Sequence, residues 1–99
     1  MIPRRSHFRD TISRQLDIFA EDEAHGLLAD VQEMKRLYDE ADRSDAEEAY
    51  GDYVDAIDAV KDALADMRDR FASTLDETAS EEYERAFETA ARRRWRWLV

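Results

Sequence analysis

The chain has 99 residues and a net charge of −10, and its composition excludes several classes of protein. A chain of this length favours one domain, spanning residues 1–99, with a modest core. The absence of cysteine excludes disulfides, thiolate zinc sites and cysteine nucleophiles. A strongly acidic chain is not expected to bind nucleic acid directly. The sequence has no apolar run long enough for a transmembrane helix, and no apolar stretch follows Arg4 and Arg5 as it would in a signal peptide. We therefore expect no membrane contact and a cytoplasmic location.

Two glycines and one proline in 99 residues favour helices joined by short connections. The first predicted helix covers 7–19, with its start set by Pro3 and a cap at Ser6. Its apolar residues recur at steps of four, four and three, which places them on one face. They are Phe8, Ile12, Leu16 and Phe19.

A second helix is predicted over 22–42, separated from the first by a break near Gly26. The alternative is one long helix over 7–42 that bends at this point. The third predicted helix, 45–75, starts at the capping-box pair Ser44 and Glu47. It has a heptad pattern for more than three repeats, formed by Tyr50, Tyr53, Ile57, Val60, Leu64, Met67, Phe71 and Thr74.

The fourth helix is predicted over 80–96, after a cap at Thr78 or Ser80. Its apolar stripe contains Phe87, Ala91, Trp95 and Leu98. The sequence therefore predicts an all-α fold: a small antiparallel bundle of three to four helices around a long heptad-patterned helix, or a long helical hairpin with two shorter helices packed on it. In a four-helix up-and-down bundle the two basic chain ends would meet at one pole. With three helices they would lie at opposite poles.

An aspartate ridge is predicted on the third helix, opposite its heptad seam. Its members, at steps of three and four, are Asp52, Asp55, Asp58, Asp62, Asp66 and Asp69. The simplest interpretation is a solvated outer face. The functional alternative is a strip of negative charge that imitates a nucleic-acid backbone and occupies the basic cleft of another protein.

The C-terminal segment 92–99 is basic and aromatic. Its net charge is +4 and that of residues 1–16 is +3, which leaves −17 for the rest of the chain. Trp95 and Trp97 are about 200° apart on a helix, so Trp97 is exposed unless the helix ends before it. Exposed Trp beside Arg is typical of protein-binding surfaces. The residues predicted to contact a partner here are Arg93, Arg94, Arg96, Trp97 and Leu98.

Asp22 and His25 have the acidic-x-x-His spacing of di-iron carboxylate bundles. A metal site would need further ligands from other helices, which only self-association would supply. We therefore expect no cofactor, and these two residues remain weak candidates. The sequence has no glycine-rich phosphate loop and no nucleophile elbow, so we expect no enzymatic activity.

These observations favour a non-enzymatic regulatory or interaction protein with a protein partner, which docks through its helical surface and its C-terminal segment. The first alternative is an acidic inhibitor, of the phage-encoded or antitoxin kind, that binds a basic nucleic-acid-binding protein through the aspartate ridge. The second is a metal-binding bundle completed by oligomerisation. Two copies pairing along the heptad seam would form a homo-oligomer.

Overall fold

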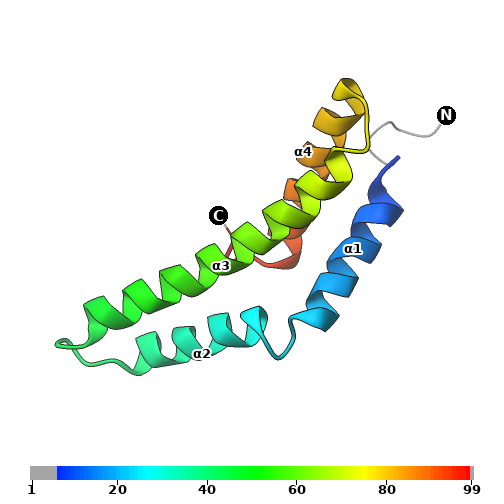
Figure 1. Ribbon diagram of the computed structural model, residues 1–99. Helices are drawn as coiled ribbons and strands as arrows, with labels where there is room; N and C mark the ends of the chain where they lie inside the picture. The colour runs from blue at the N-terminus through cyan, green and yellow to red at the C-terminus, as the bar shows by residue number, and fades with distance from the viewer. Residues whose placement is uncertain (1–6, 99) are drawn as a thin grey trace.

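The computed structural model describes residues 7–98, and within this range the chain contains helices and turns but no strand. The predicted all-α bundle is confirmed. The predicted helix start at Pro3 and Ser6 lies outside the described residues. In this range no helix is both long enough and apolar enough to cross a lipid bilayer. Figure 1 shows the helices in chain order: α1 (Arg9–Asp22), α2 (Leu27–Glu40), α3 (Ala46–Ala72) and α4 (Glu77–Arg94).

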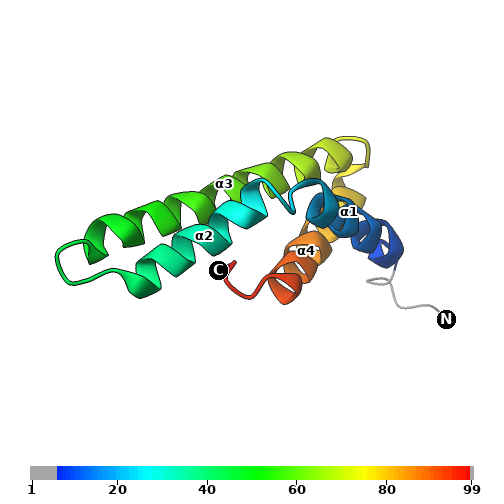
Figure 2. The ribbon, with the colours of Figure 1, turned by 90° about the horizontal axis from the view of Figure 1, so that it is seen from below.

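The helices form an elongated molecule with two unlike ends. α2 and α3 make a long antiparallel hairpin, and α1 and α4 pack together at the end of the hairpin where α3 finishes (Figures 1 and 2). α1 and α4 run in the same direction, because Gln15 pairs with Tyr83 and Asp17 with Arg94. The extents are 56 × 23 × 23 Å and the radius of gyration is 16.1 Å, above the roughly 13 Å of a compact domain of this size.

The core lies where α1, α3 and α4 meet, with Tyr83 at its centre. The Tyr83 side chain is 0% exposed, and its ring centroid lies 4.7 Å from that of Phe71 and 5.5 Å from that of Phe8. Its hydroxyl donates a hydrogen bond to Gln15 Oε1 at 2.8 Å. Burial raises the pKa of Tyr83, because the phenolate would lose its hydration. The predicted stripe of the first helix is confirmed, since Phe8, Ile12, Leu16 and Phe19 are all buried.

The heptad seam of α3 is covered within the chain, by α2 along its first part and by α4 along its last part. Val60 and Leu64 are buried, whereas Tyr50 and Thr74, at the two ends of the pattern, are exposed. Arg68 also connects α3 to α4 by donating to Glu88 at 2.6 Å. The seam therefore completes an intramolecular bundle.

The chain breaks between α1 and α2 at residues 23–26, so the alternative of one continuous helix over 7–42 is wrong. α1 continues to Asp22, beyond the predicted end at 19, and α2 begins at Leu27 rather than at 22. Glu23 Oε1 accepts a hydrogen bond from the Leu27 N–H at 3.1 Å and so satisfies one free donor at the start of α2. A Cβ at Gly26 would lie 2.7 Å from this oxygen, so glycine leaves the carboxylate room.

The N-caps predicted for the last two helices do not form. α3 begins after Asp45, which makes no side-chain capping bond, and Ser44 donates to Asp42 at 2.7 Å instead. α4 begins at Glu77 rather than at 80, because Asp76 is the cap and accepts a hydrogen bond from the Ala79 N–H at 2.9 Å. An ionised Asp accepts this bond well and also interacts favourably with the helix dipole.

Candidate functional site

The part of the hairpin farthest from α1 and α4, residues 32–59, contains no buried side chain. We call this segment the distal hairpin. Only two helices meet here, so each seam residue is covered on one side. Leu37 is 41% exposed and Tyr50 is 51% exposed. Exposed large apolar side chains at the tip of an elongated molecule are candidates for contact with another protein.

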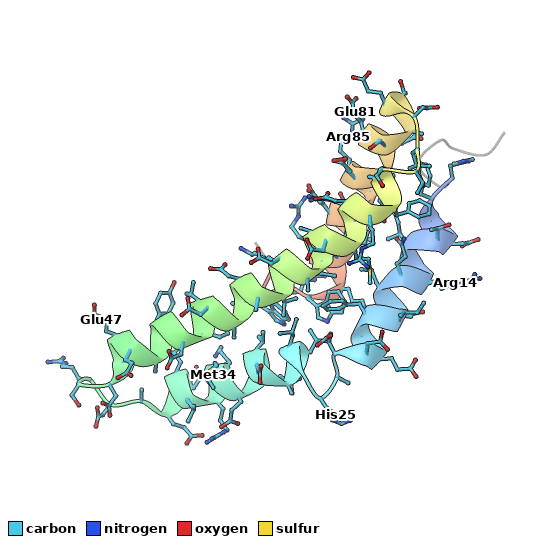
Figure 3. The ribbon with its side chains drawn as sticks, in the orientation of Figure 1. Arg14, His25, Met34, Glu47, Glu81 and Arg85 are labelled. Carbon is cyan, nitrogen blue, oxygen red and sulfur yellow. The ribbon has the colours of Figure 1, made fainter. Side chains whose placement is uncertain are left out.

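One side of the distal hairpin is hollowed into a shallow groove of about 380 Å³, which we call the hairpin groove. Its floor is apolar and consists of Met34, Leu37, Ala41 and Ala49. Met34 lies on the side of α2 that faces α3 (Figure 3). The rim is entirely acidic and consists of Glu40, Asp45, Glu48 and Asp52. The groove therefore combines a small apolar contact area with a surrounding negative field.

The other side of the distal hairpin carries a tyrosine cluster. The ring centroid of Tyr38 lies 5.3 Å from that of Tyr50 and 6.2 Å from that of Tyr53. Lys35 pairs with Asp39 at 2.6 Å, and the hydrogen bond that its ammonium donates to this carboxylate raises the pKa of Lys35. This pair is exposed to solvent, so it contributes little to stability. The cluster holds α2 and α3 together where no third helix covers them.

All six side chains of the aspartate ridge are exposed, so their predicted outward placement is confirmed. Asp69 accepts a hydrogen bond from Arg68 at 2.8 Å. The other five have no ion pair within residues 7–98. Asp52 also belongs to the rim of the hairpin groove, so the ridge and the groove form one continuous acidic surface.

The C-terminal segment folds back onto the core. α4 ends at Arg94 rather than at 96, and the chain then turns back toward the middle of the molecule (Figure 1). The Trp95 ring packs edge-on against Phe19 with centroids 5.7 Å apart. Leu98 is 6% exposed and belongs to the core, so little of its side chain is open to the predicted partner contact. Trp97 is half-buried against the core, because the helix ends before it.

Basic side chains of α1 and α4 line one groove that runs between these two parallel helices. They are Arg9 of α1 and Arg85, Arg93 and Arg94 of α4. This arrangement could not be predicted from the sequence, because the arginines are far apart in the chain and the relative orientation of the first and last helices is set by tertiary packing. Arg9 lies beside the first half of α4, so within the described residues the basic segments occupy opposite ends of the α1–α4 pair.

The proposed metal pair does not share a helix. Asp22 is the last residue of α1, and His25 lies in the turn that follows and points away from the helices (Figure 3). The spacing therefore does not produce the one-sided ligand pair on which the metal hypothesis depends. Within the described part of the chain, no group of three or more His, Asp or Glu side chains could hold a metal ion.

No protein-family model matches this chain, and no curated protein or solved structure is significantly similar to it. Three surfaces of the molecule itself are therefore the candidates for its function. These are the hairpin groove, the aspartate ridge that continues it, and the arginine-lined groove at the opposite end.

Proposed function

We propose that this protein is a non-enzymatic protein-binding module that docks through its distal hairpin. The observation that carries the proposal is a contrast in burial. Where α1, α3 and α4 meet, the apolar side chains are buried, whereas the distal hairpin extends beyond them without a buried side chain. A two-helix hairpin gains little from its own packing, because most helix stability in proteins comes from burying an amphipathic face. Contact with a partner would supply the missing third layer.

The chemistry of the hairpin groove indicates the kind of partner. Burying the exposed part of Leu37 in this groove would contribute about 1 kcal/mol, and burying that of Tyr50, on the other side of the distal hairpin, would contribute a similar amount. Tyrosine is also enriched among the residues that dominate binding energy at interfaces. The acidic rim favours a partner with basic side chains around an apolar centre, since complementary potentials speed association and suppress wrong partners. The partner surface is therefore basic at its edge and apolar at its centre.

The proposal is tested by affinity capture from host lysate followed by calorimetry with each captured protein. The hairpin variant carries Leu37→Asp and Tyr50→Ser. Its matched control is Ile18→Asp, because Ile18 is also an exposed apolar residue, at 49%, but lies on α1. We expect the hairpin variant to lose the partner and the control to retain it. Equal binding by the two variants would contradict the proposal.

A third variant tests docking through the C-terminal segment. Arg93→Ala with Arg96→Ala removes two exposed charges of this segment and leaves the half-buried Trp97 and the buried Leu98 in place. Loss of the partner with this variant alone would transfer the docking surface from the hairpin to the C-terminal segment. We expect its affinity to change little.

The aspartate ridge supports a second candidate function, that of an acidic inhibitor of a nucleic-acid-binding protein. Its five carboxylates without an ion pair within residues 7–98 face solvent along about 21 Å of α3. Duplex DNA carries one charge per about 1.7 Å of helix axis, roughly three times the charge density of this ridge. This difference makes the inhibitor the weaker proposal. It predicts that changing Asp55, Asp58, Asp62 and Asp66 to Asn abolishes binding, and unchanged binding would exclude it.

A further inference from the structure

The end of the molecule opposite the distal hairpin carries a second groove, between the parallel helices α1 and α4. We call it the arginine groove; its volume is about 990 Å³. Small side chains line much of it, including Ser13, Ala86, Thr89 and Ala90. A floor of small residues lets another helix approach closely, because little side-chain volume separates the backbones.

Four arginines and one carboxylate, that of Glu82, line this groove. Arg94 pairs with Asp17 and lies over the Trp95 ring at 5.4 Å. Arg9, Arg85 and Arg93 make no ion pair within residues 7–98. A guanidinium with free donors binds a carboxylate through two parallel hydrogen bonds. The groove is therefore equipped for carboxylates at the edge of a helical surface.

The distal hairpin of the same protein has the complementary chemistry. Residues 32–59 contain ten acidic and three basic side chains, a net charge of −7. Four of these acidic residues surround the apolar floor of the hairpin groove, and Leu37 is exposed there. Such a surface meets the two requirements of the arginine groove, carboxylates at its edge and apolar side chains at its centre.

The two surfaces lie at opposite ends of a molecule 56 Å long, so a chain in this fold cannot place its own hairpin in its own arginine groove (Figure 1). A second copy lying antiparallel alongside brings each hairpin to the other copy's groove. Both contacts then form together under a two-fold axis, the commonest symmetry of homodimers. In Figure 3, Glu47 and Arg85 mark the two ends that this arrangement brings together between copies.

We propose that the distal hairpin of one copy docks in the arginine groove of a second copy and that the two contacts form a reciprocal dimer. This inference rests on the proposed role of the hairpin as a docking surface and names one occupant for it. Each copy carries a net charge of −10, which opposes association. At physiological salt the Debye length is about 8 Å, so contacts between the apposed side chains outweigh the repulsion between more distant charges.

Sedimentation equilibrium of the purified full-length chain tests the dimer without any partner protein. We expect association that weakens when salt is raised from about 0.02 M to about 0.5 M, because the contacts are electrostatic. Repulsion between like-charged copies would give the opposite trend. A chain that is monomeric at about 1 mM and low salt would overturn the proposal. That result would leave binding of a different protein by the hairpin intact.

Charge reversal at each surface identifies the contact. The groove variant carries Arg85→Glu and Arg93→Glu. The hairpin variant used here is a different one from that described above and carries Glu48→Lys and Asp52→Lys. Each variant alone apposes like charges, so we expect association at least about tenfold weaker. An equimolar mixture apposes opposite charges at both contacts. We expect it to regain the affinity of the unaltered protein as a heterodimer, and a mixture that stays monomeric contradicts the proposed contact.

Two control variants separate this contact from the effect of net charge. Asp62→Lys with Asp66→Lys gives the same net charge of −6 as the hairpin variant, but on the ridge of α3 away from both grooves. We expect this control to associate at least as well as the unaltered protein. Arg14→Glu with Arg92→Glu matches the net charge of −14 of the groove variant at side chains outside the arginine groove, and we expect it to remain dimeric. Equal weakening by either control would overturn the proposal. Circular dichroism of every variant verifies that it is helical.

Discussion

The distal hairpin and the body of the molecule share one helix, α3, but differ in how its apolar face is covered. By the body we mean α1, α4 and the part of α3 from Val60 onward. In the body, a seam residue such as Leu64 is buried because α4 adds a further layer to the packing on α3. In the distal hairpin the same heptad pattern continues through Tyr53, which remains half-exposed between two helices.

This difference shows that a heptad pattern predicts a seam, whereas the degree of burial depends on how many helices meet at it. Packing of an amphipathic face, more than intrinsic propensity, stabilises helices in proteins. The body is therefore expected to supply most of the free energy of unfolding. The hairpin supplies an accessible surface whose apolar residues contribute little to that free energy, which suits a region that binds.

The largest expected effect comes from making the same substitution in both regions. Leu64→Ala removes a side chain that is 4% exposed, so we expect it to lower the free energy of unfolding by about 2–5 kcal/mol. Leu37→Ala acts on a side chain that is 41% exposed, so its cost should be below about 1 kcal/mol. Urea denaturation measures both. Equal losses would mean that the hairpin is packed as tightly as the body.

The N-caps of α4 and α3 provide a second matched pair. The Asp76 carboxylate accepts a hydrogen bond from the Ala79 N–H, so Asp76→Ala should cost about 1 kcal/mol. Asp45 makes no such bond, so Asp45→Ala removes only a favourable charge near the start of α3 and should cost a few tenths of a kcal/mol. Thermal unfolding at neutral pH compares the two. A larger loss from Asp45→Ala would contradict the assigned caps.

The helices and the apolar face of α1 could be predicted from the sequence, because both depend on periodicity within one segment. The helix ends were less accurate. Asp76, Thr78 and Ser80 all suit a cap, and the choice among them depends on where the chain can turn after α3. The position of Leu98 could not be decided from the sequence, because this residue fitted both the apolar stripe of the last helix and a segment that contacts a partner. The structure places Leu98 in the core.

The arginine groove could not be predicted from the sequence, because it exists only when α1 and α4 lie side by side and parallel. The contact between Gln15 and Tyr83, 68 positions apart in the chain, reports this orientation. The hairpin groove was hidden for a related reason. In the sequence, the acidic residues of its rim have the pattern of any solvated helix face, and the apolar residues of its floor have the pattern of an ordinary helix–helix seam. Only the absence of a third helix over residues 32–59 makes it a surface.

The smallest expected effect is a pH dependence that originates in the turn of the hairpin. Asp42 Oδ1 accepts hydrogen bonds from the Ser44 hydroxyl at 2.7 Å and from the Asp45 N–H at 3.1 Å. The bond from Ser44 is the main reason that the pKa of Asp42 lies below its usual value. A carboxyl group whose pKa is lower in the folded state adds stability above its unfolded-state pKa, and this stability is lost as the pH falls through the folded-state value.

Asp42→Asn should therefore lower the melting temperature slightly at neutral pH. The difference from the unaltered protein should shrink as the pH falls below about 3.9, the usual aspartate pKa. Thermal melts across this range measure the convergence. A difference that stays constant with pH would show that the turn does not depend on the ionised carboxylate. Because this turn joins two helices that lack a third layer, the change should accelerate amide hydrogen exchange in the distal hairpin and leave the amides around Tyr83 protected.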